Sequence, residues 1–187
     1  MLAHAYTPEA IRRAVECGVR SIEHGNLIDA PTAALMAERG AFAVPTLITY
    51  EALARDGARL GLGADSVAKI AQVREAGLKS LEILKAAGVK MGFGTDLLGA
   101  SHDLQSEEFL IRAQVQSNLE VLQSATLIGA ELLNQVGVIG EIAAGARADL
   151  LLVDGNPLTD LACLTGQGER IPLVMQGGKL QVNELRA

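Results

Sequence analysis

A repeated order of apolar strand, polar turn, helix and glycine constrains the first half of this chain more than any other feature. VRSIEHG predicts a strand that ends at His24, AFAVPT predicts the next strand, and VKMGFGTD predicts one that ends at Asp96. Thr7 and Asp29 are expected helix N-caps before AIRRAVEC and PTAALMAER. A long helical region is expected over 47–87, interrupted by glycines near residue 60. The alternation predicts right-handed βαβ units and a parallel sheet.

Polar residues stand where these strands are expected to end. They are His4, Thr46, His24 and Asp96. In a (β/α)₈ barrel the carboxyl ends of the strands carry the active site. Four strand–helix units are visible in the sequence, and a closed barrel needs about eight. An open doubly wound sheet also satisfies the alternation.

The pattern changes near Gly137. GVIGEIAAGARADLLLVDGNPLTDL is rich in glycine and holds one expected strand, ADLLLVDG. IPLVMQGGKLQV predicts a β-hairpin around Gly177 and Gly178. This tail therefore predicts part of a small sheet domain attached to the barrel.

Composition excludes several classes of protein. Hydrophobic residues make up 49% and charged residues 20% of the 187 residues, which predicts a buried core and little disorder. The net charge of −6 argues against nucleic acid as a partner. Cys17, expected in the core, and Cys163 form no disulfide framework, so a reducing compartment is the default. No stretch predicts a membrane span or a signal peptide, which favours a cytoplasmic location. An exported precursor is the alternative, because the natural N-terminus is expected to lie upstream of Met1.

The histidines at the strand ends point to metal chemistry. Neutral imidazole is the commonest protein ligand of zinc, and His4 and His24 would lie side by side at the ends of consecutive strands. Asp96 could add a carboxylate ligand or act as a base. A lone histidine is more often a hydrogen-bonded structural residue. Two histidines and an aspartate at equivalent strand ends favour a metal site.

Other polar residues allow two interpretations each. Tyr6 either polarises a substrate carbonyl or packs in a partly buried position, with about equal weight. His102, in the loop after the Asp96 strand, is either a loop residue or a substrate contact above the barrel mouth. Glu107 and Glu108 are adjacent, so they face different sides of a helix, and a solvated helix start is expected.

The ordered motifs AHAYTPEAI, SIEHG, GTDLLG with QSEEF, GEIAAGARADLLLVDGNPLTDL and VMQGGKL resemble the amidohydrolase superfamily. They are similar to its imidazolonepropionase-like branch, which includes Xaa-Pro dipeptidases (prolidase-like enzymes). The resemblance covers essentially the whole chain. It implies an α/β fold: the C-terminal half of a metal-dependent (β/α)₈ TIM barrel over 1–136, and C-terminal strands of a small β-sandwich domain over 137–187.

The resemblance also assigns roles to the candidate residues. His4 and His24 match the histidines of the fifth and sixth strands, which bind the second of two divalent metals, often zinc. Asp96 matches the eighth-strand aspartate, which touches the first metal and moves the proton from hydroxide to the leaving amine. Tyr6 matches a tyrosine that assists binding of the substrate carbonyl, and Tyr6 and His102 would contact substrate.

The chain departs from the family pattern in its metal ligands. It holds no HxH pair, and the lysine of the fourth strand is absent. The resemblance therefore implies that the first four strands are missing, so that Met1 begins a fragment. A half barrel exposes strand edges and an apolar inner face, which predicts a homo-oligomer.

The function implied is hydrolysis of amide C–N bonds, in dipeptide or Xaa-Pro-like substrates, by attack of metal-activated hydroxide. The chain alone would bind metal weakly and turn over poorly. A cyclic-amide hydrolase or deaminase of the imidazolonepropionase type is the alternative within the class. A non-catalytic fragment that only folds or assembles is the alternative outside it. Small-molecule or dipeptide substrates are the expected partners, with no nucleic acid and no membrane.

Overall fold

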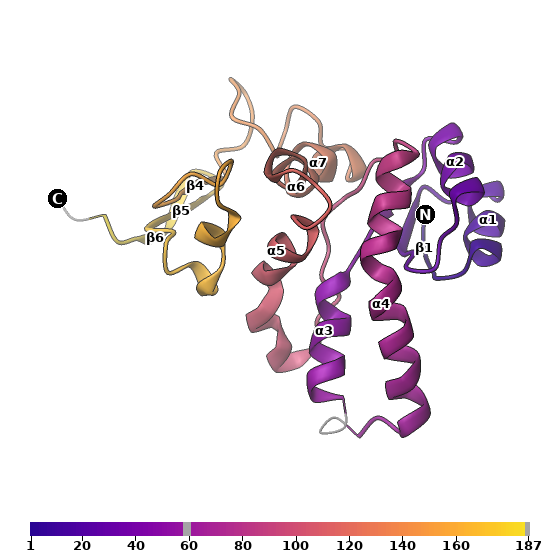
Figure 1. Cartoon of the computed structure of the whole chain (residues 1–187). Coiled ribbons are helices and arrows are strands. Elements are labelled where there is room, and N and C mark those ends of the chain that lie inside the picture. Colours follow the sequence, from indigo (N-terminus) through magenta and orange to yellow (C-terminus); the bar gives the residue numbers. More distant parts are fainter. Residues whose placement is uncertain (58–60, 186–187) are drawn as a thin grey trace.

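The computed structural model describes residues 1–57 and 61–185. Its first sheet holds β1 (Leu2–Ala5), β2 (Ser21–His24) and β3 (Phe42–Val44), all parallel and in the order β1-β2-β3. Figure 1 places this sheet and its helices at one end of the molecule. The predicted alternation and parallel sheet are confirmed.

The strand expected to end at Asp96 is much shorter than predicted. Only Met91 pairs with the sheet there, through a single parallel bridge to Ala43. Gly92 and Gly94 follow it, and a Cβ on Gly94 would come within 2.7 Å of Val44 Cγ1. Glycine weakens a strand but lets two backbones approach closely. Residues 92–98 therefore run past β3 as irregular chain.

Helices α1 (Pro8–Glu16) and α2 (Ala30–Glu38) follow β1 and β2. Both predicted N-caps form: the Thr7 side chain accepts from Ala10 N at 3.4 Å, and Asp29 accepts from Thr32 N at 2.9 Å. Each cap satisfies an amide that the first helical turn leaves without a partner. Cys17, predicted in the core, is exposed instead, because it lies at the solvent-facing end of α1.

The long helical region after β3 is two helices. α3 (Leu47–Asp56) and α4 (Ala64–Ala86) form a hairpin that projects from the body (Figure 1). The predicted break falls between Gly57 and Gly63, and 58–60 lie outside the described residues.

Most of the buried apolar residues lie between the first sheet and its covering helices. They include Ile11, Val15, Ile22, Met36, Leu81 and Leu84, each no more than 2% exposed. The opposite side of the sheet borders a cavity of about 520 Å³ lined by His4, Glu23 and Val44. The described chain thus has a packed outer face and an open inner face, as half of a barrel would.

The chain then passes through the 3₁₀ helix η1 (Gly99–Glu107), α5 (Glu108–Arg112), α6 (Asn118–Ala125) and α7 (Leu127–Leu132). A capping box starts α6, since Ser117 and Glu120 each bind the other's backbone amide. Among the described residues, no helix is long and apolar enough to cross a membrane.

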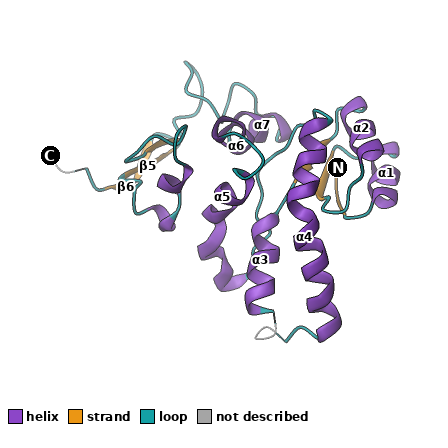
Figure 2. Ribbon diagram, viewed as in Figure 1, coloured by secondary structure: helices purple, strands orange, loops and turns teal. Residues whose placement is uncertain are grey.

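The tail forms a second, antiparallel sheet of β4 (Leu150–Leu152), β5 (Leu173–Gln176) and β6 (Lys179–Asn183). The predicted hairpin is β5–β6. The short 3₁₀ helices η2 (Leu161–Leu164) and η3 (Gly166–Gly168) lie between β4 and β5, and η2 contacts α5. Figure 2 shows this sheet beyond α5–α7, at the far end from β1–β3. The domain division at residue 137 stays a prediction.

Candidate active site

His4 and His24 meet at the carboxyl ends of β1 and β2. The parallel register sets Ala5 beside His24, one residue after His4. His4 Nδ1 and His24 Nε2 lie 2.9 Å apart, within hydrogen-bonding distance. His4 is exposed and His24 is 4% exposed, so the pair reaches from the protein interior to solvent.

Thr46, at the end of β3, fixes the orientation of His24. Thr46 Oγ1 lies 2.9 Å from His24 Nδ1, and both side chains are buried. If His24 Nδ1–H donates to Thr46, its Nε2 is an acceptor facing His4. Burial lowers the pKa of His24, and the nearby His4 adds to this, while the Asp96 carboxylate opposes it. A neutral imidazole is the form that can bind a cation.

Two tyrosines pack on this histidine pair. The Tyr6 ring stacks on His24, with centroids 4.9 Å apart and planes 11° apart. Tyr50, on α3, meets both rings edge-on and donates from its hydroxyl to the Tyr6 hydroxyl at 3.0 Å. Tyr50 carries no motif signal in the sequence. It lies four residues after Thr46, about one helical turn, and its place beside Tyr6 is visible only in the folded structure.

Asp96 lies on the irregular chain after Met91, with its side chain exposed and φ of +50°. Thr49 on α3 holds this turn by donating to the Asp96 carbonyl at 2.9 Å. The Asp96 charge acts on His24, as its effect on the pKa of that imidazole indicates. His24 itself has φ of +75°. Left-handed backbone in residues other than glycine is strained and collects at functional sites.

Glu23 is a site residue that the sequence analysis missed. It pairs with His4 in the strand register and accepts from Ser21 Oγ at 2.8 Å. Burial raises the pKa of its carboxyl, while the Ser21 hydrogen bond and His4 oppose the rise. The two-residue alternation within SIEHG was the available signal, because it turns Glu23 and Ser21 to the inner face.

His102 does not join the group. It is exposed in η1, and its Nδ1–H donates to the Gly99 carbonyl at 2.7 Å. The contact closes its own helical turn, and a role in substrate binding stays a prediction.

The expectation that Glu107 and Glu108 form a solvated helix start is wrong for Glu108. Glu108 is fully buried and accepts from Ile48 N at 2.7 Å, at the start of α3. Burial raises the pKa of Glu108 to about 7, although the Arg112 charge and the Ile48 amide oppose the rise. Arg112, also buried, donates to the Gly92 carbonyl at 2.9 Å. The two side chains tie α5 to α3 and to the chain before Asp96.

The residues present fit a divalent cation in part. Two imidazoles with facing nitrogens are suitable donors for zinc and similar ions. In the part of the chain that the structure describes, however, no three His, Cys, Asp or Glu side chains come together as a ligand group. Catalytic zinc sites have about three protein ligands. The pair by itself is therefore too small a ligand set for a catalytic zinc site.

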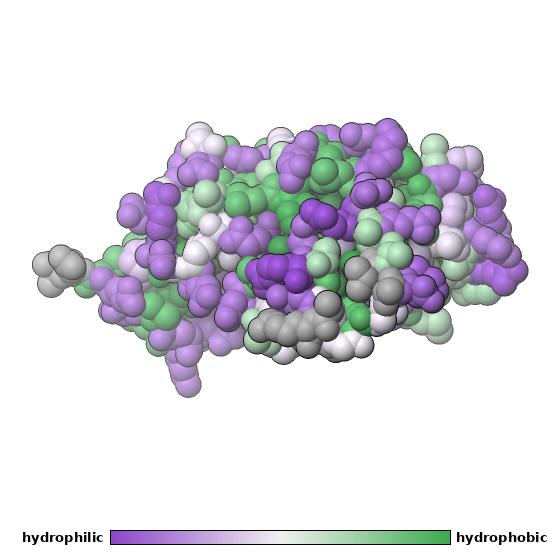
Figure 3. Space-filling view, turned by 60° about the horizontal axis from the view of Figure 1, so that its bottom comes forward, coloured by the Kyte–Doolittle hydropathy of each residue, from purple (hydrophilic) through white to green (hydrophobic). Residues whose placement is uncertain are grey.

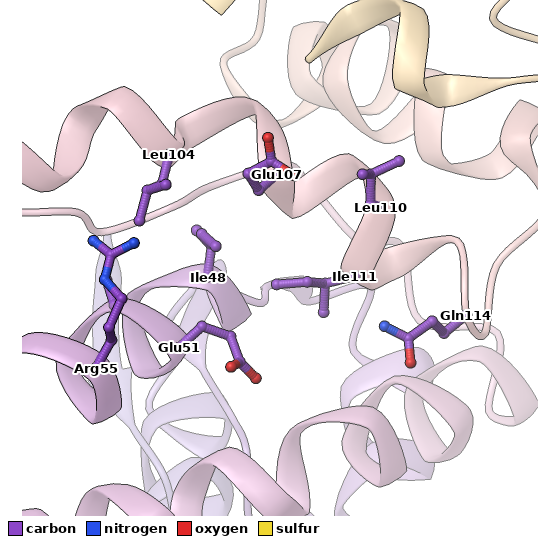
Figure 4. A pocket seen from close by; sticks show the side chains of 9 residues that line it. Ile48, Glu51, Arg55, Leu104, Glu107, Leu110, Ile111 and Gln114 are labelled. Atoms are coloured by element: carbon purple, nitrogen blue, oxygen red, sulfur yellow. The ribbon is translucent and has the colours of Figure 1, made fainter. Parts of the chain in front are cut away.

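A separate cavity of about 460 Å³ lies on the other side of α3 (Figure 4). Ile48, Glu51 and Arg55 on α3 face Leu104 and Glu107 across it. Figure 3, viewed from the hairpin end, shows hydrophobic residues interspersed with hydrophilic ones on the face turned toward the viewer. None of the site candidates lines this cavity, so α3 separates it from the histidine pair.

Comparison with known proteins identifies one family and several similar structures. Residues 1–180 match the family model described as "Amidohydrolase family". A crystal structure of an amidohydrolase is 63% identical over 99% of this chain and 45% of its own, with a TM-score of 0.97. A prolidase structure complexed with N-methylphosphonate-L-proline is 56% identical over 97% of this chain and 45% of its own, with a TM-score of 0.94.

The ochratoxinase of Aspergillus niger is 28% identical over 95% of this chain, which spans 37% of that relative's length. The chain thus covers less than half of the proteins it matches. The predicted fold class is part of a TIM barrel with C-terminal strands of a small sheet domain. It is confirmed by the partial coverage of the matched structures and by the parallel sheet followed by an antiparallel one. The chain belongs to the amidohydrolase family.

Proposed function

We propose that this chain contributes part of the active site of a metal-dependent hydrolase of amide C–N bonds, with dipeptides of the Xaa-Pro kind as substrates. The observation that carries the proposal is the contact of His4 and His24, 2.9 Å apart at the carboxyl ends of neighbouring parallel strands. Membership of the amidohydrolase family and the likeness to a prolidase support the reaction and the substrate class.

The proposed roles follow from position. His4 and His24 hold a divalent cation, with zinc as the expected ion. When bound, such a cation polarises the scissile carbonyl and lowers the pKa of water. Tyr6 donates to the substrate carbonyl beside the histidine pair. Asp96, exposed on the irregular chain after Met91, transfers the proton to the leaving amine, and His102 contacts the substrate from η1.

The incomplete ligand set limits this chain by itself. The described residues bring two ligands together, while a catalytic zinc site needs about three. We therefore expect weak metal binding and poor turnover from the chain alone.

The test measures hydrolysis of an Xaa-Pro dipeptide and of a cyclic amide with zinc added, for the wild type, His4→Ala and His24→Ala. Turnover of the dipeptide that both substitutions abolish supports the proposal. Preference for the cyclic amide supports the imidazolonepropionase-type alternative. Turnover that neither substitution changes contradicts the assigned roles.

A further inference from the structure

Tyr50 is a buried phenol at the site to which neither the sequence motifs nor the proposed reaction gives a role. It lies on α3, is 5% exposed, and meets the rings of Tyr6 and His24 at centroid distances of 6.4 Å. A purely apolar packing role would not need its hydroxyl. That hydroxyl, however, donates to the Tyr6 hydroxyl at 3.0 Å.

The contacts around Tyr50 allow one consistent direction of hydrogen bonding. His24 Nδ1 lies 2.9 Å from Thr46 Oγ1, and the Thr46 side chain acts to lower the pKa of Tyr50, as a donor to the phenol oxygen would. Each hydroxyl has one proton to donate. If Thr46 accepts from His24 and donates to Tyr50, then Tyr50 donates to Tyr6. The Tyr6 proton is then left for a group outside the network.

The surroundings keep Tyr50 in the donating form. Burial raises its pKa far above the usual value, and Tyr6 and the Asp96 charge add to the rise.

We propose that Tyr50 is a positioning residue, which occupies the acceptor side of the Tyr6 hydroxyl and so aims the Tyr6 proton at the substrate carbonyl. The inference rests on the proposed function, in which Tyr6 contacts that carbonyl. It adds Thr46 and Tyr50 as the residues that link the orientation of His24 to the orientation of Tyr6.

The composition of the chain offers a direct spectroscopic test. The sequence contains two tyrosines, Tyr6 and Tyr50, and no tryptophan. Labelling with [ζ-¹³C]tyrosine therefore gives two carbon signals, each sensitive to hydrogen bonding at its phenol oxygen. The Tyr6→Phe and Tyr50→Phe variants assign the signals by removing one each.

At fixed pH, Tyr50→Phe should move the Tyr6 signal by more than its linewidth, since Tyr6 loses a donor. The control is Thr49→Val, which removes a buried hydroxyl from the same helix that donates to the Asp96 carbonyl instead, and it should leave the Tyr6 signal in place. An unchanged Tyr6 signal in Tyr50→Phe overturns the proposal. If Tyr50→Phe does not fold, Thr46→Val should move the Tyr50 signal and Thr46→Ser should restore it; no movement overturns the proposal equally.

Kinetics on the Xaa-Pro dipeptide separate this inference from the proposed function. Tyr50→Phe should lower kcat about three- to tenfold with little change in KM, the size of one hydrogen bond. In a Tyr6→Phe background the same substitution should cost no more than about twofold, because it acts through Tyr6. If Tyr50→Phe lowers kcat by the same factor in the wild type and in the Tyr6→Phe background, a positioning role is contradicted. A moved Tyr6 signal together with turnover that His4→Ala and His24→Ala leave unchanged contradicts the proposed function and leaves the orientation of Tyr6 by Tyr50 standing.

Discussion

At the scale of single residues, polar side chains that the fold buries decide most of the chemistry. Glu108 and Arg112 are both fully buried and connect α5 to the start of α3 and to the chain before Asp96. Taking charged groups out of water is costly, so each of them shifts toward its neutral form. The segments that carry Tyr50 and Asp96 are thus each held by a hydrogen bond to a buried side chain of α5.

The raised pKa of Glu108 predicts a pH dependence of stability. Between the usual value of 4.5 and the folded value of about 7, the folded state binds this proton and the unfolded state releases it. The free energy of unfolding should therefore fall as pH rises from about 5 to 7, by roughly 2 kcal/mol from this group. Thermal unfolding across this range measures it.

Glu108→Gln should flatten that pH dependence, because the amide is neutral at every pH and does not titrate. Glu107→Gln, at the neighbouring position, is the matched control and should keep the wild-type slope. An equal slope in the wild type and Glu108→Gln would show that another group causes the dependence.

At the scale of elements, the strands and helices that position the histidine pair could be predicted, because each has a local signal. Caps at Thr7 and Asp29 and glycines after the helices mark the βαβ units. Those units alone set His4 beside His24. The shortening of the last strand to Met91 depends on how closely Gly94 approaches Val44, which is a property of packing.

The missed residues of the site depend on contacts between elements. The burial of Glu108 follows from the way α5 packs on α3, and adjacent glutamates give no sign of it. Tyr50 becomes part of the site only because α3 turns its ring toward Tyr6. Sequence spacing reports which residues share a helix face, but not what that face meets.

Gly77, within α4, tests how closely α3 and α4 pack against each other. A Cβ at this position would lie 2.8 Å from Leu47 Cδ2, and Leu47 is buried at the start of α3. Gly77→Ala should therefore destabilise the chain by about 1 kcal/mol, despite the better helix propensity of alanine. Gly129→Ala, within α7, where a Cβ meets only an ordinary contact of 3.5 Å with the Ser124 carbonyl oxygen, should be neutral or stabilising. Chemical denaturation measures the free energy of unfolding of both variants, and equal values would contradict the close packing.

At the scale of the whole molecule, the open inner face of the first sheet predicts self-association. Leu2 is 59% exposed on β1, which pairs with β2 on one side only among the described residues. Exposed apolar strands at a sheet edge favour pairing with another chain. We propose that the chain forms a homo-oligomer through this edge.

Light scattering coupled to size exclusion tests the proposal. The wild type should elute as a dimer or larger, and Leu2→Asp should shift it toward the monomer. Leu119→Asp changes a leucine of similar exposure, 53%, on α6 and should leave the assembly intact. A monomeric wild type would refute the proposed oligomer.

We propose that His4 and His24 are two ligands of a metal site whose remaining ligands the described residues do not supply. The most direct test of this proposal is calorimetric titration of zinc into the metal-stripped chain, with His4→Ala, His24→Ala and, as control, His102→Ala. We expect one weak site per chain in the wild type and in His102→Ala, and none in either of the other variants. Zinc binding that persists unchanged in both His4→Ala and His24→Ala would contradict the claim.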